Sequence, residues 1–462
     1  MPLTANSYAA QDAAYHAHGQ TNWRAHEENG ALVMERGDGV FVYDETGKEY
    51  IEGMAGLWCS SLGFSNQRLI DAASGQLNKL PYYHTFNHKS STPTAELAEK
   101  LVSIAPDNMS RVIFNCSGSE AVDTAIKMVR FYHNAIGKPE KKKVIGRINA
   151  YHGTTIASAS LCGLPPMHNY FDLPMETVIH TDSPHHYRFC EEGETEEEFA
   201  SRLARNLEDL IIKEGPETIG AMFAEPVIGA GGVIVPPATY FDKIQSILKK
   251  YDILLVSDEV ICGFGRTGNM WGCQTYDMQP DIITCAKALT ASYIPMSATI
   301  LSDKVYQAIA DGSNELGVFS HGFTYGGHPV AAAVGLETLN IYEEMRLVNV
   351  VRGLTPAFQT MLHSFQDHPL VGECRGVGMV GAIELVRNKD TKANFDPAAK
   401  VGITLAKAGE KHGVIVRAMK GDALAMCPPF IITEEQIGMM KSRLDAAFDE
   451  TYKWAKEEGL VG

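Results

Sequence analysis

The chain has 462 residues, of which 45% are hydrophobic and 21% are charged, a balance typical of a folded globular protein and not of a disordered one. Its 56 Asp and Glu residues outnumber its 40 Lys and Arg residues, so the formal net charge is −16. Because such a surface repels phosphate polymers, we expect no nucleic acid as a partner.

The sequence carries no sign of export or membrane insertion. The first residues, MPLTANSYAAQDAAYHAHG, contain neither the basic nor the apolar segment of a secretory signal. The most apolar span, from Ile219 to Pro237, is interrupted by Glu225, Pro226 and several glycines, so it does not predict a membrane helix. The nine cysteines form no CxxC pair and are expected to be reduced. These features predict a cytoplasmic enzyme.

The first two thirds of the chain alternate short β-branched runs with amphipathic stretches. An early segment, VFVYDETGKEYIE (40–52), predicts a β-hairpin. Helices are expected from Glu120 to His133 and along the apolar stripe that begins at Phe199, where Thr195 caps the helix behind an acidic loop. The alternation predicts an α/β domain with a mainly parallel sheet. The expected strands are 111–115, 143–147, 219–225, 254–258, 281–285 and 297–301.

The pattern changes after His328. A long helical segment, two apolar runs and a closing helix follow, at 330–344, 376–385, 413–418 and from Glu434. This succession predicts a second, smaller α+β domain in residues 328–462, to which the N-terminal segment 1–57 would contribute. The larger domain is expected to cover residues 58–327. Ligands of mainly parallel sheets bind at the carboxyl ends of the strands, so the chemistry should lie there.

The stretch LLVSDEVICGFGRTG (254–268) contains three glycines with the GxGxxG spacing of dinucleotide-binding proteins. A Rossmann fingerprint turns directly from a strand into a helix, so that the helix N-terminus meets the pyrophosphate. Here Gly263 follows only after DEVIC, and the residues beyond Gly268 lack a helical apolar period. An NAD-dependent oxidoreductase is therefore a remote alternative. The carboxylates Asp258 and Glu259 at the strand end remain to be explained.

A lysine follows the next strand along the chain. Within DIITCAKALT, Lys287 follows an apolar run. Its separation from Asp258 along the chain fits one strand, a loop and the next strand. A lysine in an apolar pocket has a lowered pKa and can act as an amine nucleophile that forms a Schiff base. A carboxylate that keeps a pyridine nitrogen protonated is the matching requirement of pyridoxal phosphate chemistry. The pair therefore suits this cofactor.

The phosphate of such a cofactor needs a cradle, and NCSGSEA (115–121) provides one. The strand RVIFN leads into Ser117, Gly118 and Ser119, where a helix begins with free backbone N–H groups at its positive end. Each signal is weak alone, because such a turn is more often a plain helix cap. Together, and in this order, the cradle, the carboxylate and the lysine predict a pyridoxal phosphate site.

These motifs resemble those of the class III aminotransferases, specifically the ω-transaminase or amine:pyruvate transaminase group of the pyridoxal phosphate fold-type I superfamily. The resemblance runs from about Val40 to the C-terminus and implies a large domain with a mainly parallel seven-stranded sheet plus a smaller α+β domain. It also implies that the three glycines shape a loop beside the cofactor. No metal site is predicted. The matching stretches are AGLWC, YYHTF, NCSGSEA, NAYHG, AEPVIGAGGV, SDEVICGFGRTG, CAKALT, HGFTYGGHP and VIVRA.

The resemblance implies a role for single residues of these motifs. Lys287 would carry the cofactor as a Schiff base, Asp258 would pair with its ring nitrogen, and Tyr151 and Val260 would pack on opposite ring faces. The SGS turn would bind the phosphate. Thr324 would reach the phosphate from the neighbouring subunit, so a homodimer with shared active sites is expected, with a tetramer left open. The other cofactor-binding residues implied are His152 and Glu225.

Departures from the family pattern indicate the substrate class. Ornithine and GABA-type relatives carry a glutamate, in a segment like EPIQGEAG, that can pair with the substrate-binding arginine; here EPVIGAGG places Ala230 there. This change favours a more apolar pocket that takes amines without an α-carboxylate. Arg417 of VIVRA would remain to bind the carboxylate of pyruvate. The rest of the implied lining is Leu57, Trp58, Phe86 and Tyr151.

The expected reaction is transfer of an amino group from a primary amine or ω-amino acid to pyruvate. It would give an aldehyde or ketone and L-alanine by a ping-pong mechanism in which Lys287 moves the proton. Racemisation, amine-mutase chemistry or decarboxylation with the same cofactor is the main alternative, although Arg417 as a clamp for the acceptor's carboxylate speaks against it. The natural amine donor is left open.

Overall fold

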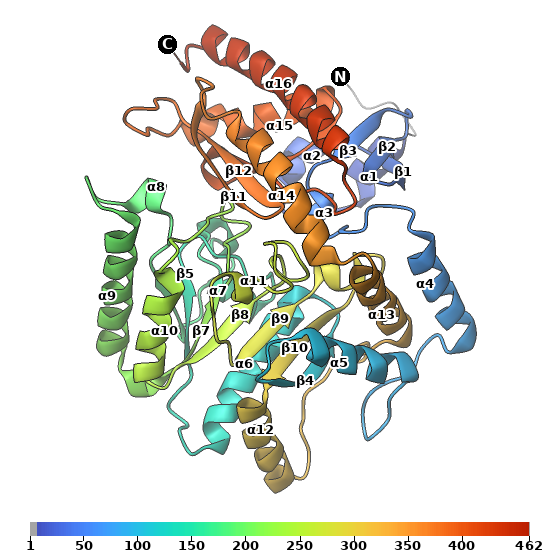
Figure 1. Cartoon of the computed structure of the whole chain (residues 1–462), viewed down its shortest axis with the longest axis vertical. Helices are drawn as coiled ribbons and strands as arrows, with labels where there is room; N and C mark the ends of the chain where they lie inside the picture. The colour runs from blue at the N-terminus through green and yellow to red at the C-terminus, as the bar shows by residue number, and fades with distance from the viewer. Residues whose placement is uncertain (1–6, 462) are drawn as a thin grey trace.

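The computed structural model describes residues 7–461 and is built around a seven-stranded sheet (Figure 1). The strand order is β4-β10-β9-β8-β7-β5-β6; β10 runs antiparallel to its two neighbours, and the other adjacent strands are parallel. This arrangement confirms the mainly parallel sheet expected from the sequence. The strands are β4 (Met109–Asn115), β5 (Lys143–Arg147), β6 (Val178–Thr181), β7 (Ile219–Ala224), β8 (Leu254–Asp258), β9 (Ile282–Cys285) and β10 (Ser297–Ser302).

The edge strand β6 is the one that the sequence analysis missed. It has four residues, and only the first and last side chains are buried, so VIHT lacks the alternation by which a half-buried strand is recognised. β6 is a strand because it pairs with β5: Val178 lies opposite Val144 in a parallel register. The other six strands overlap the runs that the sequence predicts.

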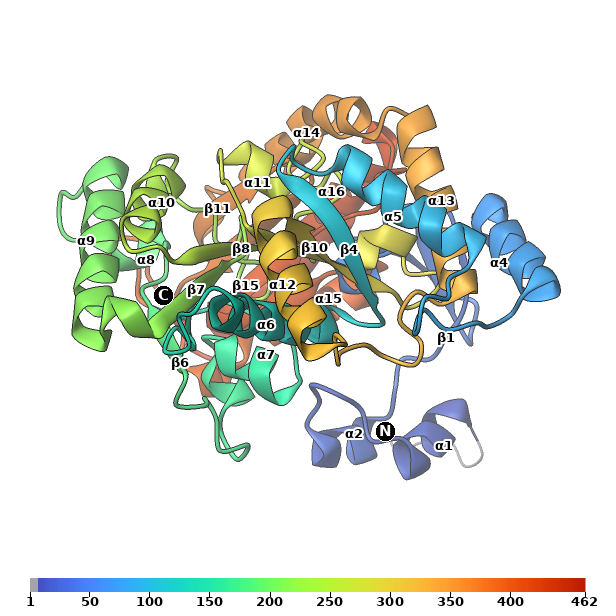
Figure 2. The ribbon, with the colours of Figure 1, turned by 90° about the horizontal axis from the view of Figure 1, so that it is seen from below.

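Helices cover both faces of the sheet. In β8, Leu254 and Val256 pack with the residues of α6, α7 and α12, whereas Leu255 packs with those of α5, α9, α10 and α13. Figure 2 shows α6 and α12 together on one side of the sheet. The helices are α5 (Thr92–Ile104), α6 (Gly118–Ala135), α7 (Ile156–Leu161), α9 (Glu196–Glu214), α10 (Tyr240–Lys250), α12 (Asp303–Leu316) and α13 (Pro329–Glu344).

Local signals fix where these helices begin. The Thr195 side chain accepts from the Glu198 N–H while the Glu198 side chain accepts from the Thr195 N–H, a capping box that starts α9. The acidic segment before Phe199 is therefore the start of a helix, as predicted. The expected helix from Glu120 to His133 lies within α6.

The smaller part of the molecule combines strands from both ends of the chain. β2 and β3 pair antiparallel, which confirms the hairpin at 40–52, and β3 pairs in parallel with β13. A second four-stranded sheet has the order β11-β12-β15-β14. The strands are β1 (Met34–Asp38), β2 (Phe41–Asp44), β3 (Glu49–Glu52), β11 (Val371–Val377), β12 (Val380–Leu385), β13 (Val414–Ile415), β14 (Arg417–Met419) and β15 (Ala423–Met426). The domain boundaries at residues 57 and 327 stay a prediction.

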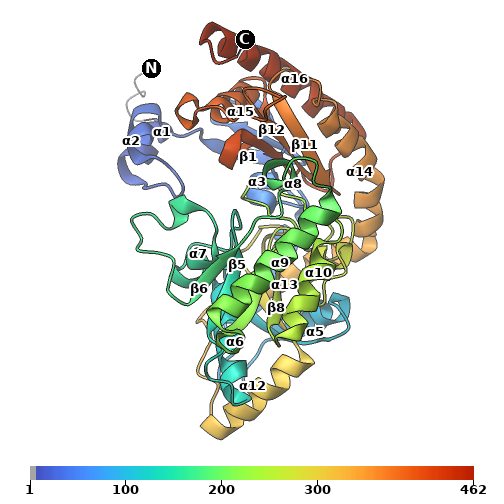
Figure 3. The ribbon, with the colours of Figure 1, turned by 90° about the vertical axis from the view of Figure 1, so that its left-hand side faces the viewer.

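Of the remaining helices, α14, α15 and α16 pack on strands of the smaller part, and α4 packs on α13. Figure 3 shows α1 and α2 on the opposite side of the smaller part from α14 and α16. The closing helix predicted from Glu434 is α16. Their bounds are α1 (Tyr8–Tyr15), α2 (Trp23–Asn29), α3 (Ala55–Trp58), α4 (Gln67–Lys79), α8 (His186–Phe189), α11 (Gly272–Thr275), α14 (Leu347–His363), α15 (Val401–Lys411) and α16 (Glu434–Glu457).

None of the helices in residues 7–461 is both long enough and apolar enough to cross a membrane. The expectation that the N-terminus carries no secretory signal falls partly on residues 1–6, which lie outside the described part of the chain.

We predict that Gly146 in β5 is required for the close contact between β5 and α7. A Cβ at this position would lie 2.5 Å from the Leu161 carbonyl oxygen, which belongs to the backbone and cannot rotate away. Gly146→Ala should lower the free energy of unfolding by about 1–3 kcal/mol, measured by urea denaturation. The matched control is Gly438→Ala on the exposed face of α16, where nothing lies within 4 Å; it should stabilise by about 0.5–1 kcal/mol. Equal effects of both changes would contradict this account.

Candidate functional site

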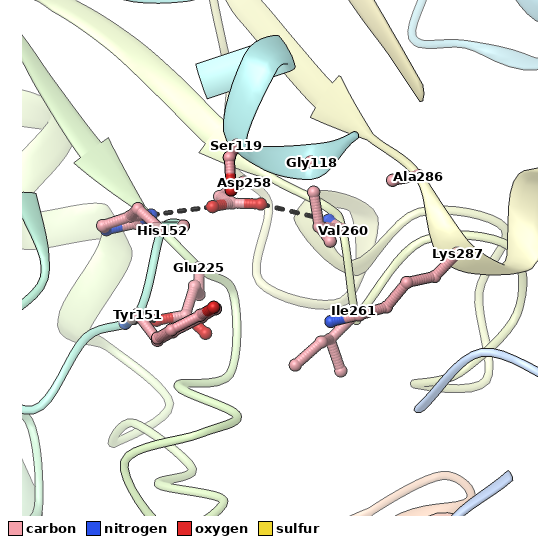
Figure 4. Close-up of a pocket in the computed structure, with 11 residues that line it drawn as sticks. Gly118, Ser119, Tyr151, His152, Glu225, Asp258, Val260, Ile261, Ala286 and Lys287 are labelled. Atoms are coloured by element: carbon pink, nitrogen blue, oxygen red, sulfur yellow. Dashed lines mark hydrogen bonds and ion pairs between the residues drawn. The ribbon is translucent and has the colours of Figure 1, made fainter. Parts of the chain in front are cut away.

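Strands β4, β5, β7, β8 and β9 end at one edge of the sheet, and the residues that follow them line one cavity of about 150 Å³, the inner cavity. β10 separates β4 from β9 and runs antiparallel to both, so β4 has the same direction as the parallel strands. The carboxyl ends therefore converge, as the sequence predicts. The lining residues are Gly118, Ser119, Tyr151, His152, Gly153, Glu225, Asp258, Val260, Ile261, Ala286 and Lys287 (Figure 4).

Asp258 is the buried carboxylate of the inner cavity. Its Oδ2 lies 2.7 Å from His152 Nδ1, and its Oδ1 accepts a hydrogen bond of 3.1 Å from the Val260 N–H (Figure 4). The side chains of His152 and Asp258 are 0% and 4% exposed. Within residues 7–461, Asp258 forms no ion pair with a lysine or arginine, so its charge is available to a cationic group placed in the cavity.

The neighbouring Glu259 has a different role. Its Oε2 accepts from the Gly272 N–H at 2.8 Å, and its Oε1 accepts from the Cys273 N–H at 2.6 Å, so the side chain ties β8 to α11. Burial raises the pKa of Glu259 to about 7. Of the two adjacent carboxylates, Asp258 alone lines the inner cavity, in agreement with the choice made from the sequence.

Lys287 stands at the start of a short 3-10 helix (Lys287–Thr290) that follows β9. Its φ is +51°, a left-handed conformation that costs a non-glycine residue about 1–3 kcal/mol and is found mainly at functional sites. Burial lowers the pKa of Lys287, which increases the fraction of neutral, nucleophilic amine. The structure therefore places an activated amine at the same cavity as Asp258.

The N-terminus of α6 closes one end of the inner cavity. Ser117 caps the helix by accepting from the Glu120 N–H, which leaves the N–H groups of Gly118 and Ser119 without an intrahelical acceptor. The Ser119 Oγ also accepts from the Thr154 N–H at 3.0 Å. Gly118 and Ser119 line the cavity and Ser117 does not. The free N–H groups and the helix dipole suit a phosphate.

Tyr151 and Val260 lie on opposite sides of the inner cavity in the view of Figure 4. Glu225 fixes the backbone of Tyr151, because its Oε1 accepts a hydrogen bond from the Tyr151 N–H at 3.1 Å. The other oxygen, Oε2, accepts from the Gly229 N–H at 2.9 Å. Burial raises the pKa values of both Tyr151 and Glu225. The site thus offers an aromatic face and an aliphatic face with a gap between them.

A second cavity of about 560 Å³, the outer cavity, shares Tyr151, Ile261 and Lys287 with the inner one. Its walls are mostly apolar, and besides Tyr151 they include four more of the residues predicted to bind substrate: Leu57, Trp58, Ala230 and Arg417. Sequence reasoning missed two polar lining residues, Gln20 and Lys420. Lys420 follows VIVRA by two residues, so its nearness to Arg417 in the sequence could have predicted its place in the cavity. Gln20 lies in the N-terminal segment, where no sequence feature predicts such a place.

Phe86 and Thr324 line neither cavity of their own chain. Both are exposed, and they lie on neighbouring segments: the Tyr82 hydroxyl donates to the Thr324 carbonyl at 2.8 Å, and Phe86 packs close to Gly322. Their predicted roles therefore stay predictions. If they serve an active site, it is one to which another copy of the chain contributes the rest.

Comparison with known proteins agrees with this geometry. The family model for class-III aminotransferases matches residues 23–448. A tomato (Solanum lycopersicum) protein, γ-aminobutyrate transaminase 3, chloroplastic, is 50% identical over 427 residues, which cover 92% of this chain and 82% of that protein. The chain belongs to the class-III aminotransferases, and it is an aminotransferase. The resemblance stated from the sequence is confirmed, and an NAD-dependent oxidoreductase is excluded.

Two similar solved structures are ω-transaminases. One, the enzyme of Pseudomonas jessenii in complex with PMP, has a TM-score of 0.95 and 53% identity, and the match covers 97% of this chain and 99% of that one. The other is a variant of the thermostable ω-transaminase PjTA-R6 with W58M, F86L and R417L, engineered for asymmetric synthesis of enantiopure bulky amines. Its TM-score is 0.96 at 53% identity, with 97% of this chain and 100% of that chain covered.

Class-III aminotransferases use pyridoxal phosphate, and the inner cavity fits this group. Free N–H groups at the start of α6 suit its phosphate, and the acceptor-only carboxylate of Asp258 suits a protonated ring nitrogen. Lys287, which lines the same cavity, would supply the amine that holds the cofactor. His152 Nε2 is buried with no hydrogen-bond partner in the described residues, so the contact between Nδ1 and Asp258 is what orients the imidazole ring.

We predict that Lys287 is the lysine that binds the cofactor, because no other lysine lines the inner cavity. Borohydride reduction of the purified protein should leave pyridoxal phosphate on the peptide that contains Lys287, detected by mass spectrometry after proteolysis. Lys287→Ala should abolish turnover even where the cofactor is retained. The control is Lys304→Ala, at an exposed site in α12. Modification of any other lysine would sink the assignment.

Proposed function

We propose that the protein transfers an amino group from a primary amine or ω-amino acid to pyruvate, giving an aldehyde or ketone and L-alanine by a ping-pong mechanism. One observation carries this proposal: the outer cavity adjoins Lys287, is mostly apolar, and contains the guanidinium of Arg417 with no carboxylate in its lining. The apolar walls suit an amine without an α-carboxylate, and Arg417 suits the carboxylate of an acceptor.

Four residues of the inner cavity have a part in this reaction. When bound, pyridoxal phosphate supplies an electron sink for the pair left when the C–H bond beside the amino group breaks. Lys287 Nζ would take that proton and return it, and its lowered pKa increases the fraction of neutral base. Asp258 would hold the proton on the ring nitrogen, and Tyr151 and Val260 would exclude water from the ring faces.

The substitutions in the engineered ω-transaminase support the choice of substrate-binding residues. Trp, Phe and Arg stand at positions 58, 86 and 417 in that protein, and this chain carries the same three residue types at the same numbers. Because that variant is engineered for bulky amines, the three positions are expected to shape the amine site here as well. γ-Aminobutyrate, named for the tomato relative, is an ω-amino acid and falls within the proposed donor class.

The test is a direct assay. The holoenzyme is incubated with pyruvate and with each donor class in turn, and L-alanine is measured. We expect alanine from ω-amino acids and from carboxylate-free amines. Alanine from neither, together with release of carbon dioxide or racemised product, would favour the alternative chemistries of the same cofactor.

We predict that Arg417→Ala harms the pyruvate half-reaction far more than the amine half-reaction. Arg417 would turn into the outer cavity for a carboxylate and away from it for an apolar amine, because a buried unpaired cation beside an apolar group is costly. Loss of a charge-assisted bidentate contact costs about 2–4 kcal/mol, or about 30- to 1,000-fold in kcat/KM for pyruvate. Single turnover with a carboxylate-free amine should change by less than about threefold. Equal losses in both half-reactions would mean that Arg417 is structural.

We also propose an obligate homodimer in which Thr324 reaches the cofactor phosphate of the partner subunit. The support is an exposed aromatic patch around Thr324, and such patches on a protein surface mark interfaces. If the patch enters the interface, Phe86 can reach the partner's outer cavity in the same way. The patch consists of Tyr82, Tyr83, Phe86 and Tyr325, with exposures of 38%, 41%, 42% and 61%.

We predict that Thr324→Ala weakens cofactor retention without changing the order of substrate preference. Loss of one hydrogen bond to a phosphate should raise the dissociation constant of the cofactor about tenfold, measured by fluorescence after dialysis. Thr391→Ala in an exposed loop is the matched control. Light scattering should give the mass of a dimer, for which an obligate interface of roughly 2,000 Å² or more is expected. An active monomer at assay concentration is the outcome that rules out the shared site.

The cytoplasmic location remains a prediction, since the tomato relative is named as chloroplastic.

A further inference from the structure

The charges around the outer cavity do not balance. Its lining contains three cationic side chains, Lys287, Arg417 and Lys420, and no aspartate or glutamate. Lys287 is needed for the cofactor, and Arg417 is proposed to bind the acceptor's carboxylate. Lys420 is the cation to which neither the family resemblance nor the proposed reaction assigns a role.

Lys420 is held by a neutral partner. It starts a 3-10 helix (Lys420–Asp422) after β14, and its Nζ donates to the Asn149 side-chain oxygen at 2.7 Å. Lys420 is an exposed residue, although partial burial lowers its pKa. In the described part of the chain no carboxylate oxygen lies within 4.0 Å of its Nζ. The Asn149 amide orients the ammonium group without supplying a counter-charge, so the group is free to donate to an anion that enters the outer cavity.

The two free cations of the outer cavity occupy different parts of it. Arg417 lies close enough to Tyr151 to affect the pKa of its hydroxyl, and Tyr151 also lines the inner cavity. Lys420 also borders a third cavity of about 320 Å³, and that cavity includes Arg188 and Arg375 but not Lys287. Lys420 therefore stands where the outer cavity adjoins the third cavity, of which Lys287 is not part.

Apolar groups make up much of the rest of the outer cavity. The outer cavity is also lined by Leu164, Pro165 and Met167, which offer contacts to methylene groups and no hydrogen-bond donors from their side chains. The arrangement matches a ligand with an amine at one end, an apolar chain, and an anion at the other end.

We propose that Lys420 binds a carboxylate remote from the reacting carbon, so that ω-amino acids of several carbons are preferred over amines without a carboxylate. This inference rests on the proposed function, because it names the donor class of the same site. A charge-assisted hydrogen bond from the ammonium would replace the missing counter-charge. Lys420 then determines which donor is chosen, and Arg417 keeps the carboxylate of the acceptor.

The first test compares matched donors. For the holoenzyme, kcat/KM is measured with ω-amino acids of four to six carbons and with n-alkylamines of equal chain length, always with pyruvate. Lys420→Met should lower the ratio of the two values about 10- to 100-fold, the worth of a hydrogen bond to a charged group. Lys420→Arg should restore it to within about threefold. The matched control is Lys453→Met, which removes an exposed charge from α16. Equal loss of kcat/KM with both donor classes would overturn the proposal, since Lys420 would then support the shape of the cavity and would not bind the carboxylate.

The second test needs no turnover. The holoenzyme is titrated by calorimetry with glutarate, which has two carboxylates, and with butyrate, which has one. Wild-type protein should bind glutarate at least about tenfold more tightly, and Lys420→Met should lose this advantage while its affinity for butyrate changes less than threefold. No advantage for glutarate in the wild type would also overturn the inference. Because binding is read separately from alanine formation, failure of this inference and failure of the proposed function are distinguishable.

Discussion

The site depends on one buried carboxylate at the end of a parallel strand. Asp258 is almost fully buried, and its hydrogen bonds come from His152 and from the backbone of Val260, both of which leave its charge uncancelled by a lysine or arginine. Burial of such a charge is unfavourable unless a cation joins it. The sheet therefore carries a built-in requirement for a protonated ligand, and the converging strand ends determine where that ligand lies.

Much of this arrangement could be predicted from the sequence because its determinants are local. Strand ends followed by Asp258, Lys287 and the SGS turn are read directly from short apolar runs, and parallel strands bring such ends together by geometry alone. The capping box of Thr195 is equally local. The decision between Asp258 and Glu259 needed the family resemblance, since adjacent residues in a strand point to opposite sides and periodicity cannot tell which side faces the cavity.

Other features depend on contacts between distant segments and could not be predicted. β6 forms because β5 pairs with it, and its own four residues carry little pattern. Lys420 reaches the outer cavity because Asn149, far away in the sequence, fixes its ammonium group. Gln20 lies there because the N-terminal segment passes over Met167, to whose sulfur its amide donates at 3.5 Å. Phe86 and Thr324 line neither cavity of their own chain, so contacts within one chain give neither residue a role in the site.

Glu225 joins two surfaces that serve different ligands. One of its carboxylate oxygens fixes the backbone of Tyr151 beside the cofactor, and the other fixes Gly229, next to Ala230 in the wall of the outer cavity. A rigid carboxylate cannot follow both partners if one of them moves. Natural variation in the loop at 229–230 that admits a larger donor is thus transmitted to the aromatic face of the ring site. In this lineage of enzymes, donor range and cofactor affinity are therefore expected to evolve together, and broadening one without the other requires a compensating change at position 225.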